Sequence, residues 1–313
     1  MTAADERRPS PHGLRPGPRP LQTRLALGDA VVLVVVDAVG EGRIRVRDAV
    51  ALVGRTDSSF EIKRSPLSPP LLVPDESALL VLKGARSPYL LIDEAREIVH
   101  LEGDTDWQRW TRAVAELVAT QADGGDLLEL YAAWLEGEAK DLREEAVGAV
   151  ADPRTGFIPL PERFVAGRVA SALDPRKPTG VRSASAYLAT LDRAGSERLL
   201  AVLAGPEGGA IANAELITLT LRAGLGFRME ATRDLLLRSL AHPDVAVRRA
   251  ALTFAPFVAA DAALHEALAR IARDEVDSDV KAQAQRALRK ISRSANGGEG
   301  DGHSAASVRR ERR

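Results

Sequence analysis

Four cations stand at the same place in a repeated pattern that runs along the chain after residue 126. Each directly follows an apolar residue that recurs along the sequence: Arg143, Arg182, Arg248 and Lys281. A regular ladder of cations could neutralise a row of phosphates, which is the chemistry of nucleic-acid binding. The alternative is a packing or loop-pairing position within a repeat. Local charge favours this alternative, because residues 244–290 hold eight Lys and Arg against seven Asp and Glu.

The sequence contains no residue set that specifies a reaction. There is no G-x-S-x-G, Walker loop or G-x-G-x-x-G in a strand–helix context. The adjacent carboxylates Glu144-Glu145 and Asp274-Glu275 would point about 100° apart on a helix, so neither pair shares a proton. The histidines are dispersed and lack the spacing of metal ligands: His12, His100, His242, His265 and His303. We therefore predict no enzymatic activity, no catalytic residue, no cofactor and no metal.

Composition bounds the class of protein. The chain has 313 residues, of which 45% are hydrophobic and 28% charged, and this is enough for two domains with a core. The net charge of −1 argues against attraction of the whole chain to nucleic acid or an anionic membrane. The longest apolar run, Ala30–Val36, is too short to span a bilayer. The first twenty residues hold no signal-peptide core, so the sequence as written predicts a cytoplasmic location; a removed leader would make the protein extracytoplasmic.

An apolar anchor followed four positions later by a small residue occurs five times. The anchors are Leu142, Val181, Ala214, Val247 and Val280, and the last four are 33 residues apart. Their small partners are Ala146, Ser185, Thr218, Ala251 and Ala284. A fixed period of this length indicates stacked structural repeats.

Each repeat is expected to be a pair of helices. Twelve residues before each anchor stands a large aliphatic residue, which would lie on the first helix: Leu130, Val169, Val202, Leu235 and Leu268. The anchor and its small partner would lie on the second helix, where small residues let helices approach closely. Asp244 and Asp277 stand three positions before their anchors, where an N-cap belongs.

The region before the repeats has the period of strands. Six segments alternate or are rich in β-branched residues: Val31–Val36, Arg43–Arg47, Phe60–Lys63, Leu79–Leu82, Tyr89–Ile92 and Ile98–Leu101. Six short strands in about 75 residues predict a small barrel. Five cations suggest one basic face on it: Arg43, Arg45, Arg47, Lys63 and Arg64. Binding of single strands also needs exposed aromatics, and Phe60 and Tyr89 are placed as core residues, so nucleic-acid binding is disfavoured.

Two resemblances to known families follow from these segments. HPDVAVRRAALTFAPFV at residues 242–258 and DSDVKAQAQRAL at 277–288 resemble HEAT repeats, in the short form also seen in the phycobilin-lyase type. That resemblance covers residues 126–291 and implies an α-solenoid that binds a protein, with no active-site residues. Residues 27–101, with ALLVLKGARSPYLLID, resemble the OB-type barrel of bacterial netrin-like modules. Netrin-like domains usually carry disulfides, and this chain has no cysteine.

The expected fold is mainly α, with a small OB-like barrel before an α-solenoid of about five HEAT-like hairpins. The expected domains are the barrel at 24–102 and the solenoid at 103–291, with disordered tails at 1–23 and 292–313. The boundary lies where the hydrophobic period changes from 2 to 3.6.

The leading functional hypothesis is a non-enzymatic scaffold that binds another protein. The alternative is a HEAT-like ligand-processing or carrier protein, similar to bilin lyases or to DNA glycosylases. Residues 126–145 hold seven acidic and two basic residues, so a partner should present basic groups there. The candidate partner-binding residues are Glu138, Glu144, Arg182 and Arg248. The sequence leaves the partner, the oligomeric state and the recognition module undefined.

Overall fold

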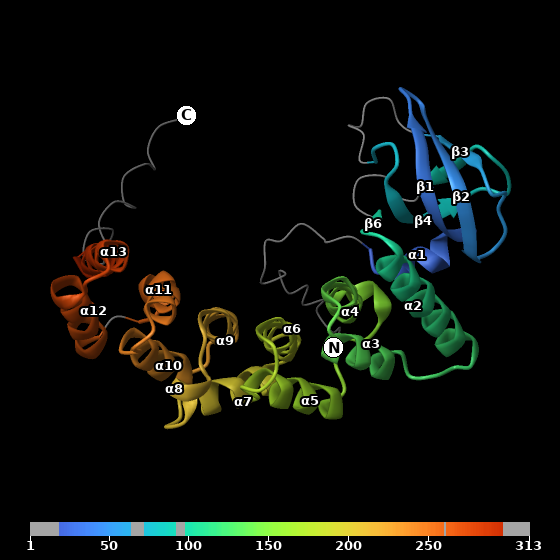
Figure 1. Cartoon of the computed structure of the whole chain (residues 1–313). Helices are drawn as coiled ribbons and strands as arrows, with labels where there is room; N and C mark the ends of the chain where they lie inside the picture. Colours follow the sequence, from blue (N-terminus) through green and yellow to red (C-terminus); the bar gives the residue numbers. More distant parts are fainter. Residues whose placement is uncertain (1–18, 64–71, 92–97, 260, 297–313) are drawn as a thin grey trace, which may run out of the picture. The chain divides into compact units, whose positions relative to one another are not determined.

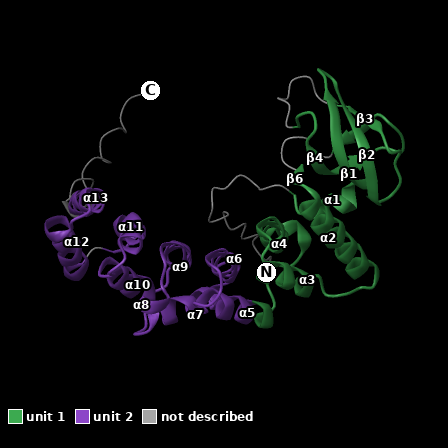
Figure 2. Ribbon diagram, in the orientation of Figure 1, with its two compact units in different colours: residues 1–164 green, residues 165–313 purple. Residues whose placement is uncertain are grey.

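A β-barrel precedes a long series of helices in the computed structural model, which describes residues 19–63, 72–91, 98–259 and 261–296 (Figure 1). The predicted mainly α fold with a small barrel is therefore confirmed. The chain divides into two compact units, residues 1–164 and residues 165–313 (Figure 2). This division differs from the expected domain boundary near residue 102, because the first helices group with the barrel.

The sheet has six strands, and five of them form the closed barrel: β1 Ala30–Val39, β2 Arg43–Val53, β3 Phe60–Lys63, β4 Ser77–Lys83, β5 Tyr89–Leu91 and, outside the closure, β6 Val99–Leu101. The order β1-β2-β3-β5-β4 closes on itself through the pairing of β4 with β1. All pairs are antiparallel except β3 with β5, and β6 pairs with the first half of β4. Every strand lies on a segment that the sequence predicted.

The first strand is buried on both faces, as its continuous β-branched run predicted. Val32 and Val34 belong to the barrel core, where the rings of Phe60 and Tyr89 meet edge to face with centroids 4.9 Å apart. On the outer side of the neighbouring strand β4, Val81 lies against the end of a helix. A Cβ added at Gly28 would come within 2.4 Å of the Val81 side chain, so only glycine fits there.

That helix, α1 Leu21–Leu27, lies partly in the segment that we expected to be a disordered tail. The expectation is wrong for residues 19–23, because Leu21 is fully buried and the Tyr131 hydroxyl donates to Gln22 Oε1 at 3.2 Å. Arg24 forms a buried ion pair with Glu145 on α4, with Nη2 and Oε2 3.0 Å apart. Seven residues are too few for a helical period to show in the sequence. Residues 1–18 lie outside the described residues.

Three further helices complete the first unit: α2 Asp104–Ala122, α3 Leu127–Glu136 and α4 Lys140–Ala151. The short turn η1 Pro153–Thr155 follows α4. Strand β6 ends at Leu101, so the change from strand to helix lies where the hydrophobic period predicted it. Trp110 is 1% exposed and donates from Nε1 to Asp141 Oδ2 at 2.7 Å, which ties α2 to α4.

Helical hairpins build the second unit, beginning with α5, which starts at the end of the first unit. The second hairpin is α5 Glu162–Leu173 with α6 Thr179–Ala189, after α3–α4 as the first. The third is α7 Arg193–Leu203 with α9 Ala214–Gly226, separated by the short α8 Gly208–Ile211. The fourth is α10 Ala231–Leu240 with α11 Val245–Phe254, and the turn η2 Ala255–Phe257 follows it. The fifth is α12 Ala262–Asp274 with α13 Ser278–Asn296, so α13 runs past the expected end at 291.

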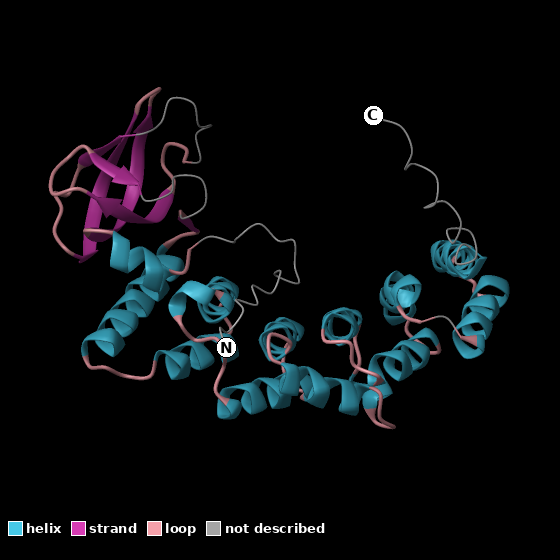
Figure 3. Ribbon diagram, turned by 180° about the vertical axis from the view of Figure 1, so that it is seen from behind, coloured by secondary structure: helices cyan, strands magenta, loops and turns pink. Residues whose placement is uncertain are grey.

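The hairpins of the second unit stack in two rows (Figure 3). The second helices α6, α9, α11 and α13 pack side by side, and α7, α10 and α12 pack in the other row. The predicted N-caps are confirmed, since Asp244 accepts from the amide of Ala246 at 2.8 Å and Asp277 from that of Val280 at 2.9 Å. Anchors Val247 and Val280 and small residues Ala251 and Ala284 are fully buried: all four have 0% exposure.

The third hairpin departs from the constant period of 33. Its N-cap is Asn213, which accepts from the amide of Leu216 at 2.9 Å, so Leu216 is the anchor and not Ala214. The buried small residue is then Thr220, with 0% exposure, and not Thr218. Val202 is 36% exposed and does not belong to the aliphatic column. The reason is α8, an extra turn between the two helices that shifts the second helix along the sequence.

Candidate partner-binding surface

One position recurs on the same face of the second helices in every hairpin of the second unit, the sixth residue after the anchor. Tyr187 is partly exposed at this position, and Arg222, Thr253 and Arg286 are exposed. The third residue after each anchor is partly exposed beside it: Ala184, Leu219, Ala250 and Gln283. We call these eight residues the second-helix face. Burial raises the pKa of Tyr187, while the nearby charge of Arg222 lowers it.

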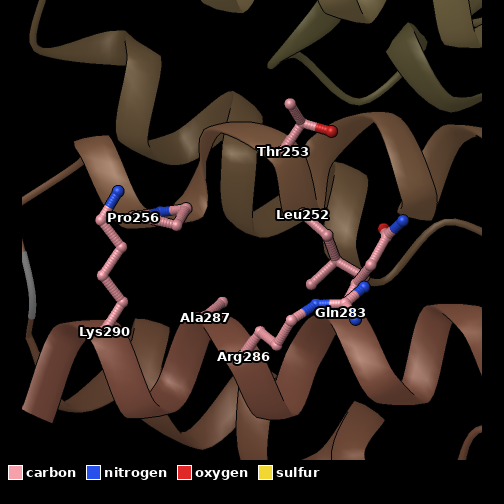
Figure 4. Close-up of a pocket in the computed structure, with 7 residues that line it drawn as sticks. All are labelled: Leu252, Thr253, Pro256, Gln283, Arg286, Ala287 and Lys290. Atoms are coloured by element: carbon pink, nitrogen blue, oxygen red, sulfur yellow. The ribbon is translucent and has the colours of Figure 1, made fainter.

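A groove of about 240 Å³ opens on this face between α11 and α13 (Figure 4). Its lining comes from both helices and the turn after α11: Leu252, Thr253, Pro256, Gln283, Arg286, Ala287 and Lys290. Proline cannot continue a helix without losing a backbone hydrogen bond. Pro256 accordingly lies in the turn η2, and α11 ends at Phe254, whereas the stacked helix α13 continues to Asn296.

The groove combines an apolar floor with polar groups at its edge. Leu252 and Ala287 are both 3% exposed and form the floor. The carbonyl oxygen of the Gln283 side chain is buried and accepts no hydrogen bond within the described residues. Phe257 is 64% exposed, and Lys290 Nζ lies 4.6 Å from the centroid of its ring. Such a groove can take up an apolar side chain and pair with an anionic group.

The ladder of cations is engaged in packing. Each cation donates to a backbone carbonyl near the end of the first helix of its own hairpin. The donor–acceptor distances are 2.6 Å from Arg143 to Gly137, 3.0 Å from Arg182 to Ala172, 2.8 Å from Arg248 to His242 and 2.9 Å from Lys281 to Arg273. These carbonyls would otherwise lack a partner at a helix end. The contacts support the loop-pairing interpretation of the repeated cation.

Two of these arginines also reach the next hairpin. Arg182 Nη2 donates to the carbonyl of Ile211, in the loop region of the third hairpin, at 2.5 Å. Arg248 donates from Nε and Nη2 to the carboxylate of Glu275, in the fifth hairpin, at 2.7 and 2.9 Å. Burial lowers the pKa of Arg182. The hydrogen bond from Arg248 holds the pKa of Glu275 below its usual value.

The four predicted partner-binding residues do not form one site. Glu138 and Glu144 are exposed in the first unit, and Glu144 lies 3.6 Å from Lys140. Arg182 and Arg248 are in the second unit, with Arg182 8% exposed, and their guanidinium groups already hold backbone carbonyls. Contact of any of the four with a partner stays a prediction.

The basic face of the barrel is paired with carboxylates. Arg43, Arg45 and Arg47 are exposed on β2, as their alternation predicted. Their nearest carboxylates are Glu61 at 2.5 Å, Asp37 at 3.8 Å and Asp75 at 2.8 Å respectively. Phe60 and Tyr89 are core residues, each 5% exposed, as predicted. Arg64 lies outside the described residues.

The groove residues were not predicted from the sequence. Their signal is weak, because Gln283, Arg286 and Lys290 share one face of α13 at intervals of three and four, a pattern common to exposed helix faces. The more useful signal is Pro256, which stops α11 early beside a longer neighbour.

The described part of the chain contains no helix with the length and apolar content needed to cross a membrane. Among the same residues, no three His, Cys, Asp or Glu side chains are grouped so that they could hold a metal ion. In comparisons of the chain with protein-family models, with curated proteins and with solved structures, no match was found.

Proposed function

We propose that the chain is a non-enzymatic scaffold whose HEAT-type repeats bind another protein through the second-helix face. The observation that carries the proposal is the groove between α11 and α13, which opens on the row of second helices. Repeat proteins use such rows of equivalent helices as extended binding surfaces. The OB-like barrel would then be an auxiliary module joined to the first hairpin through α1.

The HEAT assignment is supported by a repeated pair of features. Asp or Asn caps the second helix in the third, fourth and fifth hairpins. A cation directly after the anchor binds the end of the first helix in every hairpin except the third, where the corrected position holds Ile217. Both features recur because each hairpin must satisfy the same free backbone groups.

Site-specific photo-crosslinking in the native organism tests this proposal. A photoreactive residue is placed at Arg222 or Thr253 on the second-helix face, and for comparison at Glu197 or Glu266 on first helices. All four chosen positions are exposed, so each variant should fold. We expect protein adducts from the two second-helix positions and several-fold fewer from the two comparison positions. Equal yields from both rows, or adducts with nucleic acid alone, would contradict the proposal.

A further inference from the structure

The charged residues that line the groove between α11 and α13 are both cations. They are Arg286 and Lys290, and no Asp or Glu is among the lining residues. Arg249 forms an ion pair with Asp277, at 3.2 Å, near the other end of α13. Arg286 is exposed at the edge of the groove and forms no ion pair within the described residues. The groove is therefore complementary to a negatively charged occupant.

The size and floor of the groove indicate an occupant with an apolar side chain. A volume of about 240 Å³ is smaller than pockets for drug-sized ligands and suits one large side chain. Leu252 and Ala287 supply the floor, and the ring of Phe257 extends the apolar surface beside it. Burying an apolar side chain here would contribute the usual hydrophobic free energy.

The Gln283 side chain could accept a hydrogen bond from the backbone of a bound peptide. Its carbonyl oxygen is buried and unpaired within the described residues. A buried acceptor without a donor is costly, and a donor that arrives with a ligand removes that cost. The N–H of an extended peptide is such a donor.

These features favour a peptide over a nucleic acid. A single strand binds through bases stacked on open aromatic faces and through phosphates tracked along a groove. Here the Phe257 ring carries Lys290 on its face, and the floor is aliphatic. Carboxylates beside an apolar residue would satisfy both parts of the groove at once.

We infer that the α11–α13 groove binds an acidic segment of a partner protein, with an apolar side chain on Leu252 and Ala287 and flanking carboxylates on Arg286 and Lys290. This inference rests on the proposed scaffold function and names the chemistry of the partner. It places recognition in the last two hairpins, separate from any contact of basic partner groups with Glu138 and Glu144.

Fluorescence anisotropy with the full chain tests the inference. The probe is a labelled peptide of Glu-Glu-Leu repeats, compared with the same peptide carrying Gln for Glu and with a labelled oligothymidylate of equal charge. We expect the acidic peptide to bind about tenfold or more tightly than the Gln peptide, and its affinity to fall with salt. Equal binding of both peptides, or tighter binding of the oligothymidylate, would overturn the inference.

Two matched charge reversals locate the binding. Arg286→Glu is expected to weaken the acidic peptide by about tenfold, because it turns an attraction into a repulsion. Arg289→Glu changes the net charge equally, on an exposed position of the same helix outside the groove, and is expected to change binding by less than about twofold. Equal losses in both would show attraction to the helix as a whole. Crosslinks from Arg222 that persist while the peptide fails to bind would leave the scaffold function standing without this site.

Discussion

Two positions on the second helices hold side chains with different roles. The cation after the anchor makes hydrogen bonds within the protein, because Arg182 and Arg248 each donate to backbone carbonyls that would otherwise be free. The residue five positions further along, such as Arg286, points to solvent. Both positions can hold Arg in a helix. Only the distance along the sequence from the anchor distinguishes the arginine that bonds within the protein from the arginine that is exposed to solvent.

Ala251 is the residue whose replacement should damage the fold most clearly. Ala251→Asp would bury a carboxylate without a partner, and we expect it to lower the free energy of unfolding by about 3 kcal/mol or more. Ala246→Asp is the matched control, because Ala246 is exposed in the first turn of the same helix and should cost within about 0.5 kcal/mol. Chemical denaturation measures both. Similar losses would show that the assigned helix face is wrong.

The contact between Arg248 and Glu275 should make stability depend on pH. The pKa of Glu275 is held below its usual value of 4.5 by the hydrogen bond from Arg248. A carboxyl with a lowered folded pKa stabilises the folded state above pH 4.5, and this contribution is lost as the pH falls through the folded pKa.

We therefore expect the melting temperature of the native chain to fall more steeply below pH 4.5 than that of Glu275→Gln, which cannot titrate. At about pH 7 the variant should already melt lower than the native chain. Parallel pH profiles of the two proteins would show that this carboxyl does not contribute.

At the scale of elements, the sequence predicted the strands and the helix caps, and it missed the short helices α1 and α8. The six strands and the caps Asp244 and Asp277 follow from alternation and from N-cap chemistry, which act locally. The helix α1 was missed because two turns show no period, although its Leu21 is fully buried. The register of the third hairpin was missed because α8 alters the spacing, and the cap Asn213 would have revealed it.

The ion pair between α1 and α4 should be the most sensitive point of the first unit. Its side chains are 3% exposed for Arg24 and 11% exposed for Glu145, and Glu145 also accepts from the amide of Leu21. Arg24→Met alone would leave a buried carboxylate without its cation, at a cost of about 3 kcal/mol. The double variant Arg24→Met with Glu145→Leu should recover part of that loss. Urea unfolding measures both, and a double variant no more stable than the single one would contradict a charge-based cost.

At the scale of the whole molecule, the change of hydrophobic period and the division into compact units fall in different places. The period changes between Leu101 and Asp104, whereas the units divide after Phe164. The hydrophobic period of a segment indicates whether it is a strand or a helix. It does not indicate which compact unit that element packs into. The helices α2, α3 and α4 join the barrel's unit through contacts such as those of Arg24 and Trp110.

Hydrogen exchange in increasing urea should reveal these two units. We expect the amides of α2–α4 to become exchangeable together with those of the barrel, and at a different urea concentration from those of α9–α13. Mass spectrometry of peptides from the full chain measures this. Exchange of α2–α4 together with α9–α13, apart from the strands, would instead favour a boundary near residue 102.

Once a partner is known, charge reversal separates the two ends of the helical region. Glu138→Lys with Glu144→Lys should slow association with a partner that presents basic groups to residues 126–145, with the effect weakening at high salt. Stopped-flow or surface-binding kinetics measure the association rate. Normal association of this variant at low salt would show that the acidic residues of this segment do not contact the partner.

The arginines that reach into the following hairpin restrict how the number of hairpins can change. Excision of residues 193–226 would place Arg182 before the loop of the fourth hairpin, where Arg248 already holds the carbonyls of His242 and Pro243. Arg182 would then lose the Ile211 carbonyl, and the carbonyls of the fourth hairpin's loop would already accept from Arg248. When hairpins are gained or lost by recombination, we therefore expect the second and third hairpins to be copied or removed together. These two hairpins would be inherited as one module.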